Sequence, residues 1–120
     1  MQEAQVLLAG GVVLLSVASL LGFVQYRERQ RPEAFAAWRV VHAGGTAGAV
    51  QLLALAAVWS SFGANGSWPL ALGLVLATYA FFLGPLARAL AWQRTAKAIL
   101  AAGAVVALPT YVALPLLLRG

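Results

Sequence analysis

Long uncharged stretches alternate with short polar segments along this chain. Residues 4–26, 40–87 and 98–118 contain no Asp, Glu, Lys or Arg. A helix that crosses the hydrocarbon core of a bilayer needs about 20 apolar residues. The first and last stretches therefore each fit one crossing, and the middle stretch fits two. The pattern predicts an all-α protein, a single domain over residues 1–120 that forms a four-helix transmembrane bundle, with helices at about 6–25, 34–59, 68–92 and 97–118.

Composition agrees with this interpretation. The chain is 62% hydrophobic and 9% charged, whereas a soluble domain is about 25% charged. The segment 6–25 is interpreted as a retained helix rather than a signal peptide, because the first charge is Glu3 instead of a basic residue. Cysteine is absent, which excludes disulfides, thiolate metal sites and cysteine catalysis.

The basic residues predict the orientation in the membrane. The net charge is +5, and seven of the eight Lys and Arg residues lie where helices 1 and 2, or helices 3 and 4, are joined. The positive-inside rule then predicts a multi-pass protein of the inner (cytoplasmic) membrane, with both basic loops cytoplasmic and both termini outside. Because these charges flank membrane spans, we expect the lipid bilayer as a partner and no nucleic acid.

His42 is the only histidine, and it lies within the second predicted span. An imidazole in hydrocarbon needs a partner, so His42 is a candidate functional residue. At roughly 100° per residue, Arg39 and Gly45 share its side of the helix, and Arg88 on the third helix is expected at a similar depth. Gly45 would leave room for a flat group. These features suit haem b, with His42 as the ligand of the iron and with Arg39 and Arg88 on the propionates.

Purely structural roles for the same residues stay open. His42 can be a polar residue bonded to a carbonyl, and Arg39 and Arg88 can be anchors at the membrane interface. With one histidine, no cysteine and Met1 as the only methionine, a haem would be five-coordinate, or would take water, a tyrosine or another subunit's His42. An open position on iron is a Lewis-acid site. No residue is assigned a catalytic role.

A second stripe on the same helix carries Gly44, Gly48 and Gln51. It predicts close helix packing, with Gln51 donating or accepting a hydrogen bond across the contact. Tyr79 and Tyr111 are expected to serve interfacial or packing roles. Four short helices do not easily enclose a macrocycle, so we expect a homo-oligomer, with small residues such as Gly10, Gly11 and Gly44 as contact surfaces.

The segment Trp38-x-x-x-His42-x-Gly44, followed by a run of small apolar residues, resembles the second helix of bacterial styrene oxide isomerase. The resemblance covers the second and third helices, and the first and fourth only by hydropathy. It implies a fold similar to the membrane eicosanoid and glutathione enzymes, assembled as a trimer, with haem b on His42 near a subunit interface. It also implies a small hydrophobic substrate, an epoxide that binds ferric iron and rearranges to an aldehyde by a hydride shift (the Meinwald rearrangement), so that the enzyme is an isomerase.

Two positions depart from the family pattern. The asparagine expected six residues after the histidine is Gly48, and the tyrosine expected on the third helix falls at Ala87. Two alternatives therefore remain: a membrane haem protein for electron transfer or haem handling that performs no rearrangement, and a small channel or transporter subunit.

Overall fold

The structure, a computed structural model, describes residues 2–62 and 67–118. It contains α1 (Gln2–Arg27), α2 (Pro32–Val58), the short 3-10 helix η1 (Trp59–Phe62), α3 (Trp68–Ala89) and α4 (Gln93–Leu118). Four helices are long and apolar enough to cross a membrane. This confirms the predicted all-α, four-span architecture in the described part of the chain. The predicted turn between the second and third helices falls partly on residues 63–66, outside the described residues.

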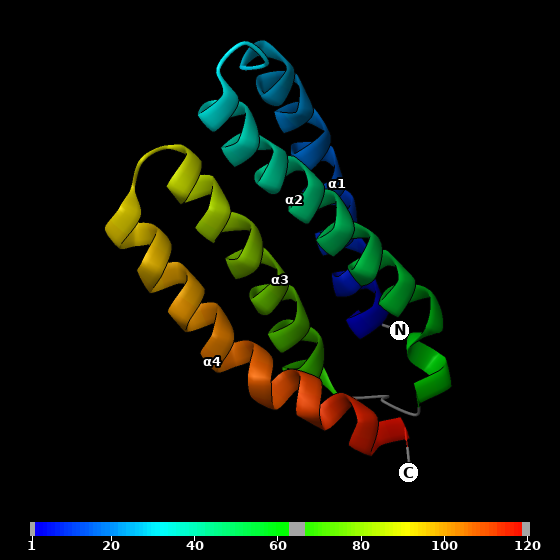
Figure 1. Cartoon of the computed structure of the whole chain (residues 1–120). Helices are drawn as coiled ribbons and strands as arrows, with labels where there is room; N and C mark the ends of the chain where they lie inside the picture. The colour runs from blue at the N-terminus through cyan, green and yellow to red at the C-terminus, as the bar shows by residue number, and fades with distance from the viewer. Residues whose placement is uncertain (1, 63–66, 119–120) are drawn as a thin grey trace.

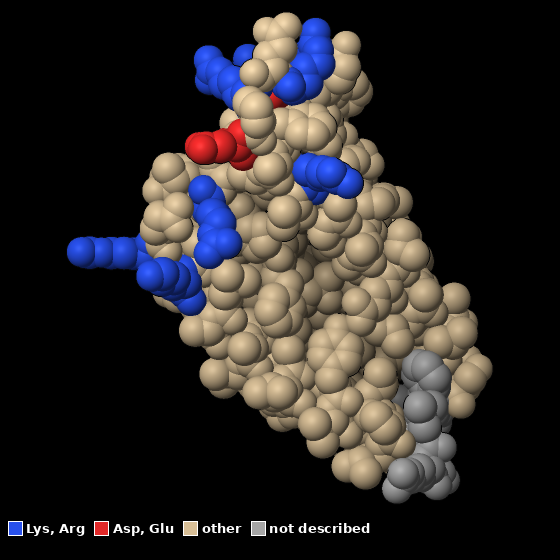
Figure 2. Space-filling model, in the orientation of Figure 1, with Lys and Arg blue, Asp and Glu red and all other residues tan. Residues whose placement is uncertain are grey.

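The helices pack as two antiparallel pairs (Figure 1). α1 packs on α2, α3 packs on α4, and α3 also contacts both α2 and α1. The α1–α2 and α3–α4 connections lie at the same end of the bundle, which we call the basic end. On the face shown in Figure 2, the Lys and Arg side chains gather there and the rest of the described surface is almost free of charge. This distribution is the one expected of a protein whose middle lies in hydrocarbon.

Two clusters of buried side chains hold α1, α2 and α3 together. The cluster far from the basic end includes Leu7, Leu52 and Leu74. The cluster nearer to the basic end consists of Leu14, Val41, Ala49 and Phe82. In the most apolar 18-residue segment of each helix, half of the residues of α3 are buried, whereas only 6% of those of α4 are buried. α3 is therefore the central helix, and α4 presents most of its circumference to its surroundings.

The α3–α4 connection is shorter than the sequence predicts. α3 ends at Ala89 rather than near residue 92, and α4 begins at Gln93 rather than Lys97. The Trp92 N–H donates to the Ala87 carbonyl at 2.8 Å, and the Ala91 N–H donates to the Arg88 carbonyl at 3.0 Å. This pair of bonds is a Schellman motif, which places the residue after the helix cap in the left-handed region. That residue is Ala91, with φ of 64°.

Replacing Ala91 with glycine is expected to stabilise the protein. The left-handed conformation costs an alanine roughly 1–2 kcal/mol, and the extra freedom of glycine in the unfolded chain offsets up to about 1 kcal/mol of this gain. We expect a net increase of roughly 0.5–1 kcal/mol in the free energy of unfolding, measured by denaturant titration of the reconstituted protein. Ala89→Gly, placed in the last turn of α3, is the matched control and should destabilise. A less stable Ala91→Gly protein would contradict the assigned turn.

Candidate functional site

The His42 imidazole lies against α1. Its Nδ1 atom is 2.6 Å from the carbonyl oxygen of Ala18. A carbonyl oxygen can only accept a hydrogen bond, so Nδ1 carries the proton and donates it. The ring also lies beside Gly22, because a Cβ built at that glycine would be 3.0 Å from the imidazole Cε1. Helix α1 therefore supplies both an anchor and a recess for the ring.

The other ring nitrogen, Nε2, is left with its lone pair. It has no hydrogen-bond partner among the described residues, and it is not one of their fully buried polar atoms. His42 itself is only partly buried. A histidine that binds a metal through one nitrogen almost always donates the other N–H to a carbonyl or carboxylate. A purely structural imidazole would also make the bond to Ala18, but only a ligand histidine needs Nε2 to be free.

Ala18 and Gly22 belong to this site and were not predicted. Thr46 lies one turn after His42, and its Oγ1 donates to the His42 carbonyl oxygen at 2.8 Å. Gly22 offered a weak signal, since an isolated glycine within an apolar helix often marks a close approach. The Ala18 carbonyl offered none, because the sequence does not give the register of α1 against α2.

Arg39 lies on the His42 side of α2, as predicted. It precedes His42 by three residues, which is about 60° around the helix and roughly 4.5 Å towards the basic end. Its side chain is exposed and has no hydrogen bond or ion pair among the described residues. The guanidinium is therefore available to an anion beside the imidazole.

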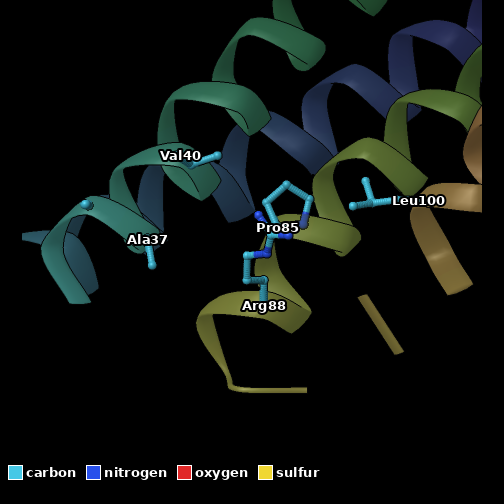
Figure 3. A pocket seen from close by; sticks show the side chains of 6 residues that line it. Ala37, Val40, Pro85, Arg88 and Leu100 are labelled. Carbon is cyan, nitrogen blue, oxygen red and sulfur yellow. The ribbon is translucent and has the colours of Figure 1, made fainter. Parts of the chain in front are cut away.

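Arg88 does not lie beside His42 within one protomer, and its predicted contact with a haem propionate stays a prediction. Arg88 lines a pocket of about 280 Å³ between α2, α3 and α4, together with Val40, Pro85 and Leu100 (Figure 3). His42 follows Val40 by two residues, which places it about 160° away around α2. The guanidinium of Arg88 and the imidazole of His42 consequently lie on opposite sides of the helix.

The free space expected at Gly45 is also absent. A Cβ built at Gly45 would be 2.8 Å from Phe82 Cδ2 and 2.9 Å from the Ala18 Cβ. The glycine thus allows α1, α2 and α3 to pack closely, and the structure offers no support for a cofactor contact there. At Gly11 a built Cβ would likewise lie 2.9 Å from the Leu53 side chain, whereas nothing lies within 4 Å of a Cβ built at Gly44.

The second stripe of α2 faces α3 and α4. Gln51 Nε2 donates to the Tyr111 hydroxyl at 2.6 Å, which confirms the predicted hydrogen bond across a helix contact. Gly48 packs against Thr78. Tyr79 donates to the Gly10 carbonyl at 2.8 Å, in agreement with a packing role.

Four membrane-spanning helices that present an anchored imidazole with a free second nitrogen define a class, the integral membrane proteins with a candidate histidine ligand. The family model of styrene oxide isomerase matches residues 3–119. The chain therefore belongs to this family, and the match extends the resemblance of the second and third helices to all four. Comparisons with curated proteins and with solved structures found no match.

Proposed function

We propose that the protein is an integral membrane haem b protein that isomerises small hydrophobic epoxides to aldehydes, with His42 as the axial ligand. The observation that carries the proposal is the free Nε2 of an imidazole whose Nδ1–H is held by Ala18. Membership of the styrene oxide isomerase family supports the class of reaction.

Each residue of the site has a defined task. The Ala18 carbonyl fixes the tautomer and the orientation of the ring and makes Nε2 a stronger donor to a metal. Gly22 leaves space for the ring, and Arg39 offers a charge-assisted hydrogen bond to a propionate. When bound, haem supplies a Lewis-acidic iron with an open position, since the chain has one histidine and no cysteine. The uncharged span around His42 keeps water away from an epoxide, which water would open to a diol.

The proposal includes a homo-oligomer. The core between α1, α2 and α3 is filled by side chains such as Leu14 and Phe82, so a macrocycle on His42 must lie on the outer surface of the protomer. A neighbouring copy would cover its other side, and the family resemblance implies a trimer. In that arrangement the proposed contact of Arg88 with a propionate would be made to the haem of a neighbouring copy.

A haem protein without isomerase activity is the second candidate. It is favoured by the two positions that depart from the family pattern. Ala87 is only 4% exposed and carries no polar group, and Gly48 has no side chain to contact a substrate. The remaining alternative, a channel or transporter subunit, has no observation in its favour.

One preparation tests these proposals. The protein is purified in a mild detergent, its absorption spectrum is recorded, and its conversion of styrene oxide is followed by gas chromatography. We expect a Soret band and an aldehyde product. A helical, folded protein without a Soret band would overturn the haem proposal. A Soret band without aldehyde would favour the second candidate.

Arg39→Gln is expected to weaken haem retention about tenfold, since a hydrogen bond to a charged group contributes about 1.5–3 kcal/mol. The measurement is the rate of haem transfer to apomyoglobin. Arg88→Gln should accelerate the transfer only in the assembled oligomer. Arg94→Gln, at the exposed start of α4, is the matched control. Equal rates of haem transfer from the Arg39→Gln and Arg94→Gln proteins would show that Arg39 does not contact the haem.

A further inference from the structure

The pocket of about 280 Å³ beside Arg88 is apolar apart from that one side chain. Its lining residues come from three helices: Ala36, Ala37 and Val40 on α2, Pro85 and Arg88 on α3, and Leu100 on α4. Arg88 lies in the last turn of α3, but its side chain extends back towards Pro85, between Val40 and Leu100 in the view of Figure 3. The guanidinium is therefore directed towards an apolar space between the helices.

The charge of Arg88 is not balanced within the chain. Arg88 makes no hydrogen bond or ion pair with any other described residue. A cation beside hydrocarbon needs an anion or a strong acceptor, and a guanidinium binds a phosphate through two parallel N–H bonds. It has five N–H donors, so a phosphate leaves three of them for the haem propionate predicted above. The pocket therefore offers a place for a phosphate at the edge of an apolar space.

Two further charged residues lie nearer to the basic end. Glu33 precedes Ala37 by four residues, so it shares that side of α2 and lies about 6 Å closer to the basic end. Lys97 precedes Leu100 by three residues and shares its side of α4 in the same way. Both side chains are exposed, and neither forms an ion pair with a described residue. From the pocket outwards, the guanidinium of Arg88 is thus followed by the carboxylate of Glu33.

Phosphatidylethanolamine has the complementary order of groups. Its acyl chains are followed by a phosphate and then, at the outer end, by an ammonium group. A cavity of about 150 Å³ holds benzene, so the pocket of about 280 Å³ accommodates the first part of one acyl chain, and the remainder lies in the bilayer. Phosphatidylglycerol also has a phosphate for Arg88 and Lys97, but it offers no cation to Glu33.

We propose that this pocket binds one phosphatidylethanolamine molecule from the surrounding bilayer. The phosphate lies on Arg88, the ammonium group lies at Glu33, and one acyl chain begins between Val40 and Leu100. The pocket is formed within one protomer, on the side of α2 opposite His42, and it needs no haem. The lipid site therefore stands or fails independently of the proposed function.

The test measures lipid binding to the purified full-length protein by native mass spectrometry, with phosphatidylethanolamine and phosphatidylglycerol of identical acyl chains. We expect the first phosphatidylethanolamine to bind roughly threefold more tightly than the first phosphatidylglycerol, since an exposed ion pair is weak. Glycerophosphoethanolamine, the same headgroup without acyl chains, should not compete. Equal binding of the two lipids, or tighter binding of phosphatidylglycerol, would overturn the proposal and would indicate a general attraction of the basic end for anions. Competition by the soluble headgroup would overturn the role of the apolar pocket.

Two charge variants identify the headgroup contacts. Arg88→Gln should weaken phosphatidylethanolamine binding roughly tenfold, because it removes a charge-assisted pair of hydrogen bonds. Glu33→Gln should abolish the preference over phosphatidylglycerol. Arg94→Gln and Glu28→Gln, on charged residues that do not line the pocket, are the matched controls and should bind as the wild type does. An unchanged preference in the Glu33→Gln protein would overturn the assigned orientation of the headgroup.

Two further variants test the pocket itself. Val40→Trp should fill the pocket and exclude both lipids, whereas Val13→Trp, on a similarly exposed valine of α1, should not. The His42→Ala protein should keep phosphatidylethanolamine binding, and loss of binding in that variant would overturn the proposal by assigning the lipid to the haem site. Circular dichroism confirms that each variant is folded, and Val40→Trp replaces Arg88→Gln if the latter is not.

Discussion

Replacing His42 with alanine is expected to remove haem from the purified protein altogether. The chain has no second histidine, no cysteine and only Met1 as a methionine, so no other strong ligand can take the place of the imidazole. The Soret band and the haem-to-protein ratio should both fall to the background level, and epoxide turnover should fall with them. The bundle should remain folded, because the bond from Nδ1 to the Ala18 carbonyl contributes only about 1 kcal/mol to stability.

Two additional measurements separate loss of the ligand from general damage. Imidazole added to the His42→Ala protein should restore part of the Soret band, since the recess beside Gly22 is then vacant. Thr46→Ala removes a hydroxyl that bonds the His42 carbonyl and should leave the spectrum unchanged. An undiminished Soret band in the His42→Ala protein would show that another residue binds the iron.

Gly22→Leu is expected to reduce haem retention more than tenfold without altering the imidazole itself. A Cβ at this position would lie 3.0 Å from Cε1 and 3.2 Å from Nδ1 of His42, which is too close for the ring to keep its place beside a larger side chain. The ring must therefore move, and its bond to Ala18 is lost. Haem transfer to apomyoglobin measures the retention, and denaturant titration measures any loss of stability.

Gly44→Leu is the matched control for this effect. It makes the same change on α2, at a position where nothing within the chain lies within 4 Å of the new Cβ, so it leaves the recess beside His42 intact. The two variants should therefore differ in haem retention, with the loss confined to the Gly22→Leu protein. Loss of haem from the Gly44→Leu protein would instead place Gly44 in the predicted contact between copies. Full haem retention by Gly22→Leu would mean that the ring does not need its recess against α1.

The four helices were predictable because a membrane imposes a simple rule on sequence. Long apolar stretches within a bilayer form helices, because helices satisfy every backbone hydrogen bond internally. The uncharged residues 4–26, 40–87 and 98–118 are long enough for four such helices. The ends were less predictable, since polar residues such as Gln2 and Gln93 continue a helix beyond the hydrocarbon. The turn after α3 gave no signal, because a left-handed residue is usually glycine and here it is Ala91.

The site was predictable only in part. A helical wheel shows which residues share a face of one helix, but it does not show which other helices pack against that face. It placed Arg39 beside His42 correctly. It could not show that α1 faces His42 while α3 and α4 face Val40, so Arg88, which was placed only by its expected depth, could not be assigned to a side of α2. It also treated Gly45 as free space, although the Phe82 side chain from α3 fills that position. The haem, its ligand and the trimer remain predictions.

The exposed position of α4 at the edge of the bundle affects how molecules enter the pocket of about 280 Å³ that Arg88 lines between α2, α3 and α4. α4 is held mainly by α3, and among the described residues Gln51 on α2 also donates a hydrogen bond to Tyr111 on α4. Lateral pressure from the surrounding acyl chains therefore acts directly on the width of the opening between α2 and α4. The same polypeptide should admit small molecules at different rates in a micelle and in a bilayer, with membrane thickness and chain packing acting as the regulator.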